Sequence, residues 1–203
     1  LAGSHGQLVH VSPFVPVPPT PGHYVVTDAC PFGFAGVLYR DFVPAAWYAT
    51  PLPALALRKF QASVGDSSHT TTWEALALLV ALRVWPSSGT ARVHVRSDSL
   101  SALRSLVHLT GKSSALGTIS REFALDCIHG QYVIDLAVHI PGITNTVADD
   151  LSRMWAPEAH AFPTVLRDVP QVQVPSLDSS FWKVSSTRTR GGAKVRARAK
   201  PLA

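Results

Sequence analysis

Cysteine is scarce in this chain. The 203 residues include only Cys30 and Cys127, which are far apart and show no Cys-x-x-Cys spacing. This excludes a disulfide framework and a cysteine-based zinc site, and it favours a reducing compartment. The sequence also lacks a G-x-x-x-x-G-K-[ST] segment, which excludes a P-loop. No internal repeat is visible, so we expect one domain of ordinary size with extensions.

Long hydrophobic runs are also missing. The longest apolar run, Ala75 to Leu82, is far shorter than the roughly 18 residues that a membrane span requires. No charged segment with a cleavage site opens the chain. We therefore expect an intracellular protein, in the cytoplasm or nucleus, with no membrane partner. The chain begins with Leu1 rather than Met, which suggests a piece of a longer polypeptide.

Positive charge is concentrated at the end of the chain. Seven of the 18 lysines and arginines lie in residues 183–203, beyond the last acidic residue, Asp178. The preceding 182 residues therefore carry 11 basic side chains against all 13 acidic ones, a net charge of −2. We expect a disordered basic tail, which is either simply solvated or attracted to the phosphates of a nucleic acid.

Proline marks the edges of the predicted domain. Residues 1–22 contain five prolines and are expected to form an extended linker. The chain becomes Pro-rich and irregular again over residues 156–182, so the predicted core ends before this extension. The periodic patterns lie between these two segments, and residues 23–155 form the predicted domain.

The periodic patterns within this domain predict alternating strands and helices. We expect strands at 23–30, 34–40, 91–98 and 133–140, a weaker strand at 46–49, and helices at 72–85, 98–109, 114–128 and 145–155. The helix at 72–85 is apolar nearly all round, so it should be buried. This order predicts an α/β fold, with a mixed sheet flanked by helices.

Acidic residues occur where these predicted elements begin or end. Asp28 and Asp98 lie at strand ends, Glu74 begins the buried helix, and Asp149 or Asp150 lies on the last helix. Crowded carboxylates repel one another unless a cation separates them. Carboxylates and phosphates are ligands of Mg²⁺, and two ions about 3.5–4 Å apart can promote phosphodiester cleavage. The acids therefore predict nuclease chemistry.

Four sequence blocks carry a family resemblance. YVVTDACPFGFAGVLY, TTWEALALLVALRVW, VRSDSLSAL and HIPGITNTVADDLSR resemble, in order, the motifs of the ribonuclease H domain of retroelement reverse transcriptases. The resemblance covers about residues 23–155. The last block is the most specific, because it is similar to the signature of long-terminal-repeat and tyrosine-recombinase retrotransposons.

The resemblance implies a ribonuclease H-like fold and cleavage of the RNA strand of an RNA/DNA hybrid, yielding a 3′-hydroxyl and a 5′-phosphate. It also implies two Mg²⁺ ions, with Mn²⁺ as the alternative metal, and an upstream reverse transcriptase domain in the same polyprotein. The implied metal-binding catalytic acids are Asp28, Glu74, Asp98 and Asp149. Asp149 is preferred to Asp150 because it matches the aspartate of the family's A-D-x-L-S-R motif.

Three further residues are candidates for the site. The resemblance implies that His139, on the loop before the last helix, acts in proton transfer or product release. A hydrogen bond between this histidine and the backbone is the simpler alternative. Ser99 and Asn145 are candidate substrate contacts, although Asn145 is equally consistent with an N-cap.

Structural roles could also explain some of the acids. Glu74 could close a capping box with Thr71, and Asp98 could be the N-cap of the following helix. Asp126 and Asp135 are expected to be solvated.

Other families and functions remain as alternatives. Integrases and transposases share the fold but place the glutamate last, whereas proofreading exonucleases require an acid at position 30, which is Cys30. Holliday-junction resolvases share the order of acids but should lack the HIPG segment. The alternative from another class is a catalytically silent connection module that binds nucleic acid.

Overall fold

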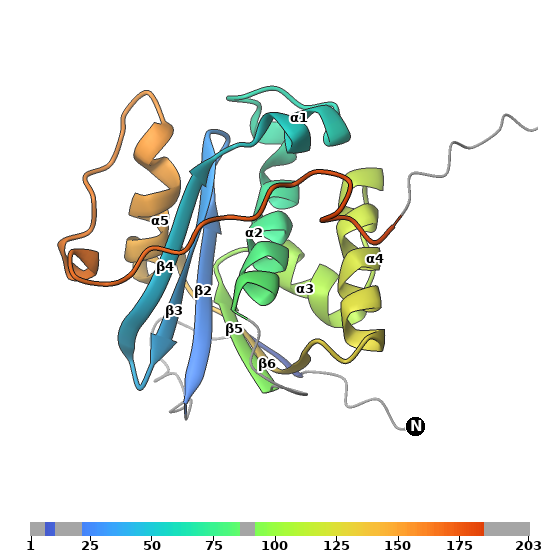
Figure 1. Ribbon diagram of the computed structural model, residues 1–203, viewed down its shortest axis with the longest axis horizontal. Helices are drawn as coiled ribbons and strands as arrows, with labels where there is room; N and C mark the ends of the chain where they lie inside the picture. Colours follow the sequence, from blue (N-terminus) through green and yellow to red (C-terminus); the bar gives the residue numbers. More distant parts are fainter. Residues whose placement is uncertain (1–6, 11–21, 86–91, 185–203) are drawn as a thin grey trace, which may run out of the picture.

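The computed structural model describes residues 7–10, 22–85 and 92–184, so the predicted basic tail lies outside the described residues except for Lys183 and Val184. The described chain forms one sheet with helices on both faces (Figure 1). The strands are β1 (Gln7–His10), β2 (His23–Ala29), β3 (Gly33–Arg40), β4 (Val43–Pro51), β5 (Arg92–Ser97) and β6 (Val133–His139). The helices are α1 (Ala54–Phe60), α2 (Thr70–Val84), α3 (Leu100–His108), α4 (Ser114–Ile128) and α5 (Thr146–Ser152).

The sheet is mixed, as the sequence predicted. Its strand order is β1-β6-β5-β2-β3-β4, in which β2, β3 and β4 are antiparallel, and β2, β5, β6 and β1 are parallel. Without β1, the strands taken in chain order give the sequence 3-2-1-4-5 across the sheet. The predicted architecture, a mixed sheet flanked by helices, is therefore confirmed.

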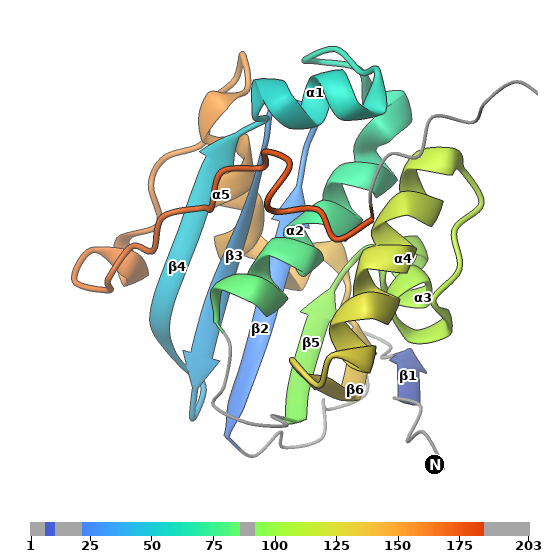
Figure 2. The ribbon, with the colours of Figure 1, turned by 45° about the vertical axis from the view of Figure 1, so that its right-hand side comes forward.

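Helix α2 forms the centre of the larger hydrophobic layer. It packs on one face of the sheet together with α3 and α4, whereas α5 covers the opposite face (Figure 2). Every residue from Thr72 to Leu82 is buried, which confirms the prediction of a buried helix. Burial on all sides arises because α2 lies between the sheet and α4. No helix in the described parts of the chain combines the length and hydrophobicity needed to cross a lipid bilayer.

Two short elements were not predicted. Strand β1 lies within the predicted Pro-rich linker and pairs in parallel with β6. Helix α1 has seven residues and follows β4 directly. Both are too short for a hydrophobic period to stand out. The weakly predicted strand at 46–49 is in fact β4, nine residues long.

The segment after Trp155 belongs to the core, although the sequence prediction ended the core before it. Leu166, Leu177 and Phe181 are all at least 92% buried. The segment also protects the outer edge of β4, because the Trp47 backbone N–H donates to Pro170 and its carbonyl accepts from Val172. It then crosses to α4, where it ends as the red ribbon in Figure 2. Covering an edge strand in this way prevents it from pairing with another chain.

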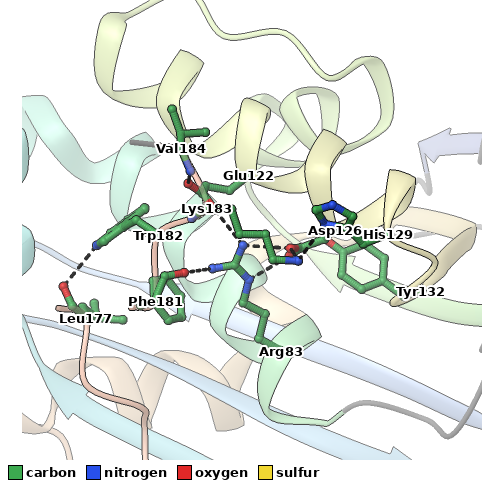
Figure 3. A network of polar contacts seen from close by, with 10 residues as sticks. All are labelled: Arg83, Glu122, Asp126, His129, Tyr132, Leu177, Phe181, Trp182, Lys183 and Val184. Carbon is green, nitrogen blue, oxygen red and sulfur yellow. Dashed lines mark hydrogen bonds and ion pairs between the residues drawn. The ribbon is translucent and has the colours of Figure 1, made fainter. Parts of the chain in front are cut away.

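A buried charge network fixes the end of this segment (Figure 3). Arg83 of α2 donates to Glu122 at 2.7 Å, to Asp126 at 2.8 and 2.9 Å, and to the Phe181 carbonyl at 2.5 Å. Both carboxylates have 0% side-chain exposure. The expectation that Asp126 is solvated was therefore wrong. Its cationic partner lies 43 residues away in the sequence, so no local pattern marks the pair.

The same carboxylates hold the backbone and side chain at the end of the described chain. Glu122 accepts hydrogen bonds from the backbone N–H groups of Lys183 and Val184, at 2.9 and 2.8 Å. The Lys183 ammonium lies 2.7 Å from Asp126. Two cations thus balance two buried anions, and Lys183, which the sequence assigned to the tail, contacts the folded domain.

Candidate metal centre

Three of the four predicted acids come together at the carboxyl ends of neighbouring parallel strands. Asp28 is the penultimate residue of β2, and Asp98 directly follows β5, which pairs with β2. Glu74 extends toward them from the second turn of α2. One carboxylate oxygen from each of the three lies within 4.8 Å of the others. Parallel strand ends meet at one edge of a sheet, which is the usual place for a binding site in α/β proteins.

Burial and mutual repulsion disfavour negative charge at this site. Asp28 is 3% exposed and Glu74 is 6% exposed. Burial raises the pKa of Asp28 to about 7, and the nearby charges of Asp98 and Asp149 also raise it, while the hydrogen bond from Ser152 opposes the shift. Burial, followed by the charges of Asp28 and Asp98, raises the pKa of Glu74 well above its usual range. A bound cation would reverse both effects by stabilising the ionised carboxylates.

The donor set fits a hard divalent cation. Glu74 Oε2 is buried and has no hydrogen-bond partner among the described residues. Buried polar oxygens rarely lack a partner without a reason, and an ion that is not part of the structure is one such reason. Carboxylate oxygens are the ligands that Mg²⁺ prefers. The three acids could therefore hold Mg²⁺ or Mn²⁺.

The purely structural alternatives for these acids do not apply. Helix α2 begins at Thr70, so Thr71 lies inside the helix, and the residue at the N-cap position, His69, makes no side-chain cap. The predicted capping box between Thr71 and Glu74 is thus absent from this helix start. Ser99, rather than Asp98, caps α3, with its hydroxyl accepting from Ala102 N–H at 3.3 Å. A structural role therefore accounts for Ser99, and neither Glu74 nor Asp98 serves as a cap.

Asn145 connects two of the acids. Its side-chain amide donates to the Thr27 carbonyl at 3.1 Å, and to Asp28 Oδ1 and Asp98 Oδ1, each at 3.3 Å. It occupies the N-cap position of α5, but its side chain makes no cap hydrogen bond to that helix. The cap interpretation is therefore wrong for its side chain. Asn145 instead holds the Asp28 and Asp98 carboxylates next to each other.

Asp149 is oriented differently from the other three acids. Its Oδ1 accepts from Arg153 Nε at 2.6 Å, and its Oδ2 lies 3.8 Å from His160 Nδ1. It forms a second group with Asp150 and His160, whose potential ligand atoms also lie within 4.8 Å of one another. Asp149 is still close enough for its charge to raise the pKa of Asp28. The structure thus brings together three of the predicted acids and places the fourth beside them, paired with Arg153.

His139 lies beside Asp98, at the end of a strand rather than in a loop. It is the last residue of β6, and its Nε2 is 2.9 Å from the Asp98 carbonyl oxygen. A carbonyl can only accept, so Nε2 carries the proton in this contact. Transfer of that proton to a substrate would require this hydrogen bond to break. The turn after His139 also lies close to Asp98. A Cβ atom on Gly142 would be only 3.2 Å from Asp98 Oδ2.

Ser152 is a site residue that the sequence analysis missed. Its Oγ lies 2.5 Å from Asp28 Oδ2, and the residue is fully buried. It occurs four residues after the buried Ala148, so both lie on the same face of α5. A serine among apolar residues on the inward face of the predicted helix could have identified Ser152 as a candidate site residue.

The described chain also forms a basic groove. It has a volume of about 590 Å³ and lies between the start of α2, helix α3 and the loop that leads to α4. Its basic side chains are Arg104, His108 and Lys112, and several serine and threonine residues contribute hydroxyl groups. No acidic side chain lines it in the described part of the chain. Thr72 and Ser101 line the groove, whereas Asp28, Glu74 and Asp98 do not.

Comparison with known proteins gives structural similarity without a family assignment. No protein-family model matches the sequence, and no curated protein matches it. Ribonuclease H1 from the halophilic archaeon Halobacterium salinarum aligns with 68% of this chain and 98% of its own, at 19% identity and a TM-score of 0.49. LC11-RNase H1, isolated from compost by a metagenomic approach, aligns with 65% of this chain and 93% of its own, at 19% identity and a TM-score of 0.48.

The N-terminal ribonuclease H domain of a Mycobacterium tuberculosis protein, solved as a fusion with maltose-binding protein, is a more distant neighbour. It aligns with 63% of this chain and 95% of its own, at 16% identity and a TM-score of 0.42. Similarities of this size do not assign an activity, which has to be argued from the site itself.

Proposed function

We propose that this chain is a divalent-metal-dependent ribonuclease that cleaves the RNA strand of RNA/DNA hybrids. The observation that carries the proposal is the group formed by the buried Asp28 and Glu74 and the half-buried Asp98, in which one glutamate oxygen has no partner among the described residues. Such a group is costly to keep unless a cation neutralises it. The four sequence blocks that resemble retroelement ribonuclease H motifs support the same proposal.

We assign a separate role to each residue of the site. Asp28, Glu74 and Asp98 would hold Mg²⁺ or Mn²⁺, with Asp149 as the fourth acid after release from Arg153. When bound, two such ions would activate a water molecule and stabilise the departing 3′-oxygen of the RNA. Asn145 would keep Asp28 and Asp98 together, and His139 would hold the backbone of Asp98.

The groove is suited to the backbone of a nucleic acid. Arg104, His108 and Lys112 offer positive charge, and the hydroxyl groups can donate to phosphate oxygens. Neighbouring 2′-hydroxyl groups are what distinguish RNA from DNA, so contacts to them would select the strand to be cut. We also propose that the domain acts within a retroelement polyprotein, downstream of a reverse transcriptase domain. That proposal rests on the sequence resemblance alone.

Cleavage of a defined hybrid tests the function. The purified chain is incubated with end-labelled RNA annealed to DNA, in Mg²⁺ and in EDTA. We expect endonucleolytic cleavage in Mg²⁺ only, leaving 3′-hydroxyl and 5′-phosphate ends. Single-stranded RNA and duplex DNA serve as substrate controls and should remain intact.

The catalytically silent module makes a different prediction in the same experiment. It would bind the hybrid, as measured by fluorescence anisotropy, without cutting it under any metal condition. Binding without cleavage would therefore overturn the nuclease proposal.

A further inference from the structure

Helix α5 holds the Asp28 carboxylate from both of its ends. Asn145 precedes the first residue of the helix and donates to Asp28 Oδ1 at 3.3 Å. Ser152 is the last residue of the helix, and its hydroxyl donates to Asp28 Oδ2 at 2.5 Å. Each carboxylate oxygen thus has a partner of its own. Two separate donors fix the rotation of a carboxylate more firmly than one donor does.

The surroundings of Ser152 hold its hydroxyl in place. The residue is 0% exposed, in a position where an apolar side chain would be the ordinary choice. Its carbonyl accepts from Cys30 Sγ at 3.1 Å. A Cβ on Gly33 would lie 2.8 Å from that same carbonyl, so only glycine allows β3 to come this close to the end of α5. The end of the helix is therefore fixed against the strand pair that carries Asp28.

The Ser152 hydroxyl has two acceptors within reach but only one hydrogen to donate. Asp28 Oδ2 is at 2.5 Å, and the Asp149 carbonyl is at 3.0 Å. Hydrogen bonds to charged acceptors are the stronger ones, so an ionised Asp28 takes the hydrogen. The Asn145 amide reaches Asp28 Oδ1 and Asp98 Oδ1 together. With Oδ2 held by Ser152, Oδ1 is the oxygen turned toward Asp98.

We propose that Ser152 is a positioning residue for the metal centre, and that its hydroxyl fixes the Asp28 carboxylate in the orientation that binds the ion. This inference rests on the proposed function. Residues that orient metal ligands typically change metal affinity or activity about ten- to hundredfold when they are removed.

The test compares Mn²⁺ binding by the wild-type chain and by Ser152→Ala, measured by electron paramagnetic resonance of free Mn²⁺. We expect Ser152→Ala to bind Mn²⁺ about ten- to hundredfold more weakly. Its kcat for hybrid cleavage should fall while its KM for the hybrid is unchanged, because the groove is intact. The matched control is Ser120→Ala, which removes another buried serine hydroxyl, 2.6 Å from Ser105, and should leave Mn²⁺ binding unchanged.

A second pair of variants isolates the hydroxyl from any effect of shape. Ser152→Thr keeps the hydroxyl and adds one methyl group, whereas Ser152→Val adds the same methyl group and puts a second one in place of the hydroxyl, so the two side chains have nearly the same shape. We expect tighter Mn²⁺ binding by Ser152→Thr than by Ser152→Val. Equal binding by this pair, or by wild type and Ser152→Ala, would overturn the role of Ser152 alone. A wild-type chain that does not bind Mn²⁺ would instead overturn the proposed metal centre.

Discussion

Replacement of Asp28 by asparagine should lower the rate of hybrid cleavage at least about a hundredfold and, in metal-free buffer at neutral pH, make the protein more stable. The loss of cleavage follows because an amide cannot supply the negative charge that holds a divalent cation. Removal of one preorganised electrostatic group typically lowers kcat by about a hundred- to a thousandfold. We expect at least the lower value for Asp28→Asn in the labelled-hybrid assay.

The gain in stability follows from the raised pKa of Asp28. Burial raises this pKa from 3.8 to about 7, so the folded chain binds a proton more tightly than the unfolded chain does. Stability should therefore decrease as the pH rises from about 4 to about 7, and stay low above that range. A shift of this size corresponds to at most about 4 kcal/mol. The neutral asparagine avoids this loss of stability. Asp28→Asn should therefore be more stable than the wild type at neutral pH and equally stable near pH 4.

The asparagine can also keep the local hydrogen bonds. Its Oδ1 can accept from Asn145, and its Nδ2 can donate to the Ser152 hydroxyl, which then donates to the Asp149 carbonyl. Thermal denaturation at pH 7.5, with and without Mg²⁺, measures the effect. Mg²⁺ should stabilise the wild-type chain and not Asp28→Asn. Asp168→Asn, which changes an exposed aspartate, should resemble the wild type in both assays. Undiminished cleavage by Asp28→Asn would contradict the assignment.

Arg83→Ala should be the most destabilising of the substitutions considered. It would leave the carboxylates of Glu122 and Asp126, both with 0% side-chain exposure, without their main cationic partner. Removal of one partner from a buried ion pair typically costs about 3–5 kcal/mol. It would also free the Phe181 carbonyl and so loosen the C-terminal segment. In a domain of this size the melting temperature should fall by roughly 6–20 °C.

Chemical denaturation of Arg83→Ala, Lys183→Ala and Arg121→Ala measures how much each side chain contributes to the free energy of unfolding. Lys183 has 25% side-chain exposure and shares Asp126 with Arg83, so its removal should cost less than the removal of Arg83. Arg121, an exposed arginine on α4, is the matched control and should change stability by no more than about 0.5 kcal/mol. A similarly small effect of Arg83→Ala would show that the network does not hold the C-terminal segment.

The sequence predicted the fold where the hydrophobic pattern is long. The stretch at 72–85, which is apolar nearly all round, was correctly expected to be a buried helix, and the predicted helix at 114–128 has the same limits as α4. β1 and α1 were missed because four and seven residues do not establish a period. Burial of the C-terminal segment was missed because its Pro-rich sequence carries no regular pattern. Its place in the core depends on contacts with residues far away in the sequence, such as Trp47 and Arg83.

The sequence predicted the part of the site that lies at the ends of the strands. Asp28 and Asp98 meet because they lie at the ends of neighbouring parallel strands. The sequence predicted that both lie at strand ends, and the structure shows that the two strands are neighbours. The Asp149 side chain contacts Arg153 and His160. Arg153 follows Asp149 by four residues, a helical spacing that could have indicated this pair, whereas His160 lies beyond the helix, where no periodic pattern indicates a contact. The contact between Ser152 and Asp28 joins residues 124 positions apart, so it too could not be read from local sequence.

Anomalous X-ray diffraction from crystals of the chain grown with Mn²⁺ would show whether Asp28, Glu74 and Asp98 bind a metal ion. We expect anomalous density between these three carboxylates and its loss in Asp28→Asn. Density found only at the second acidic group, formed by Asp149, Asp150 and His160, or at neither group, would contradict the proposed metal centre.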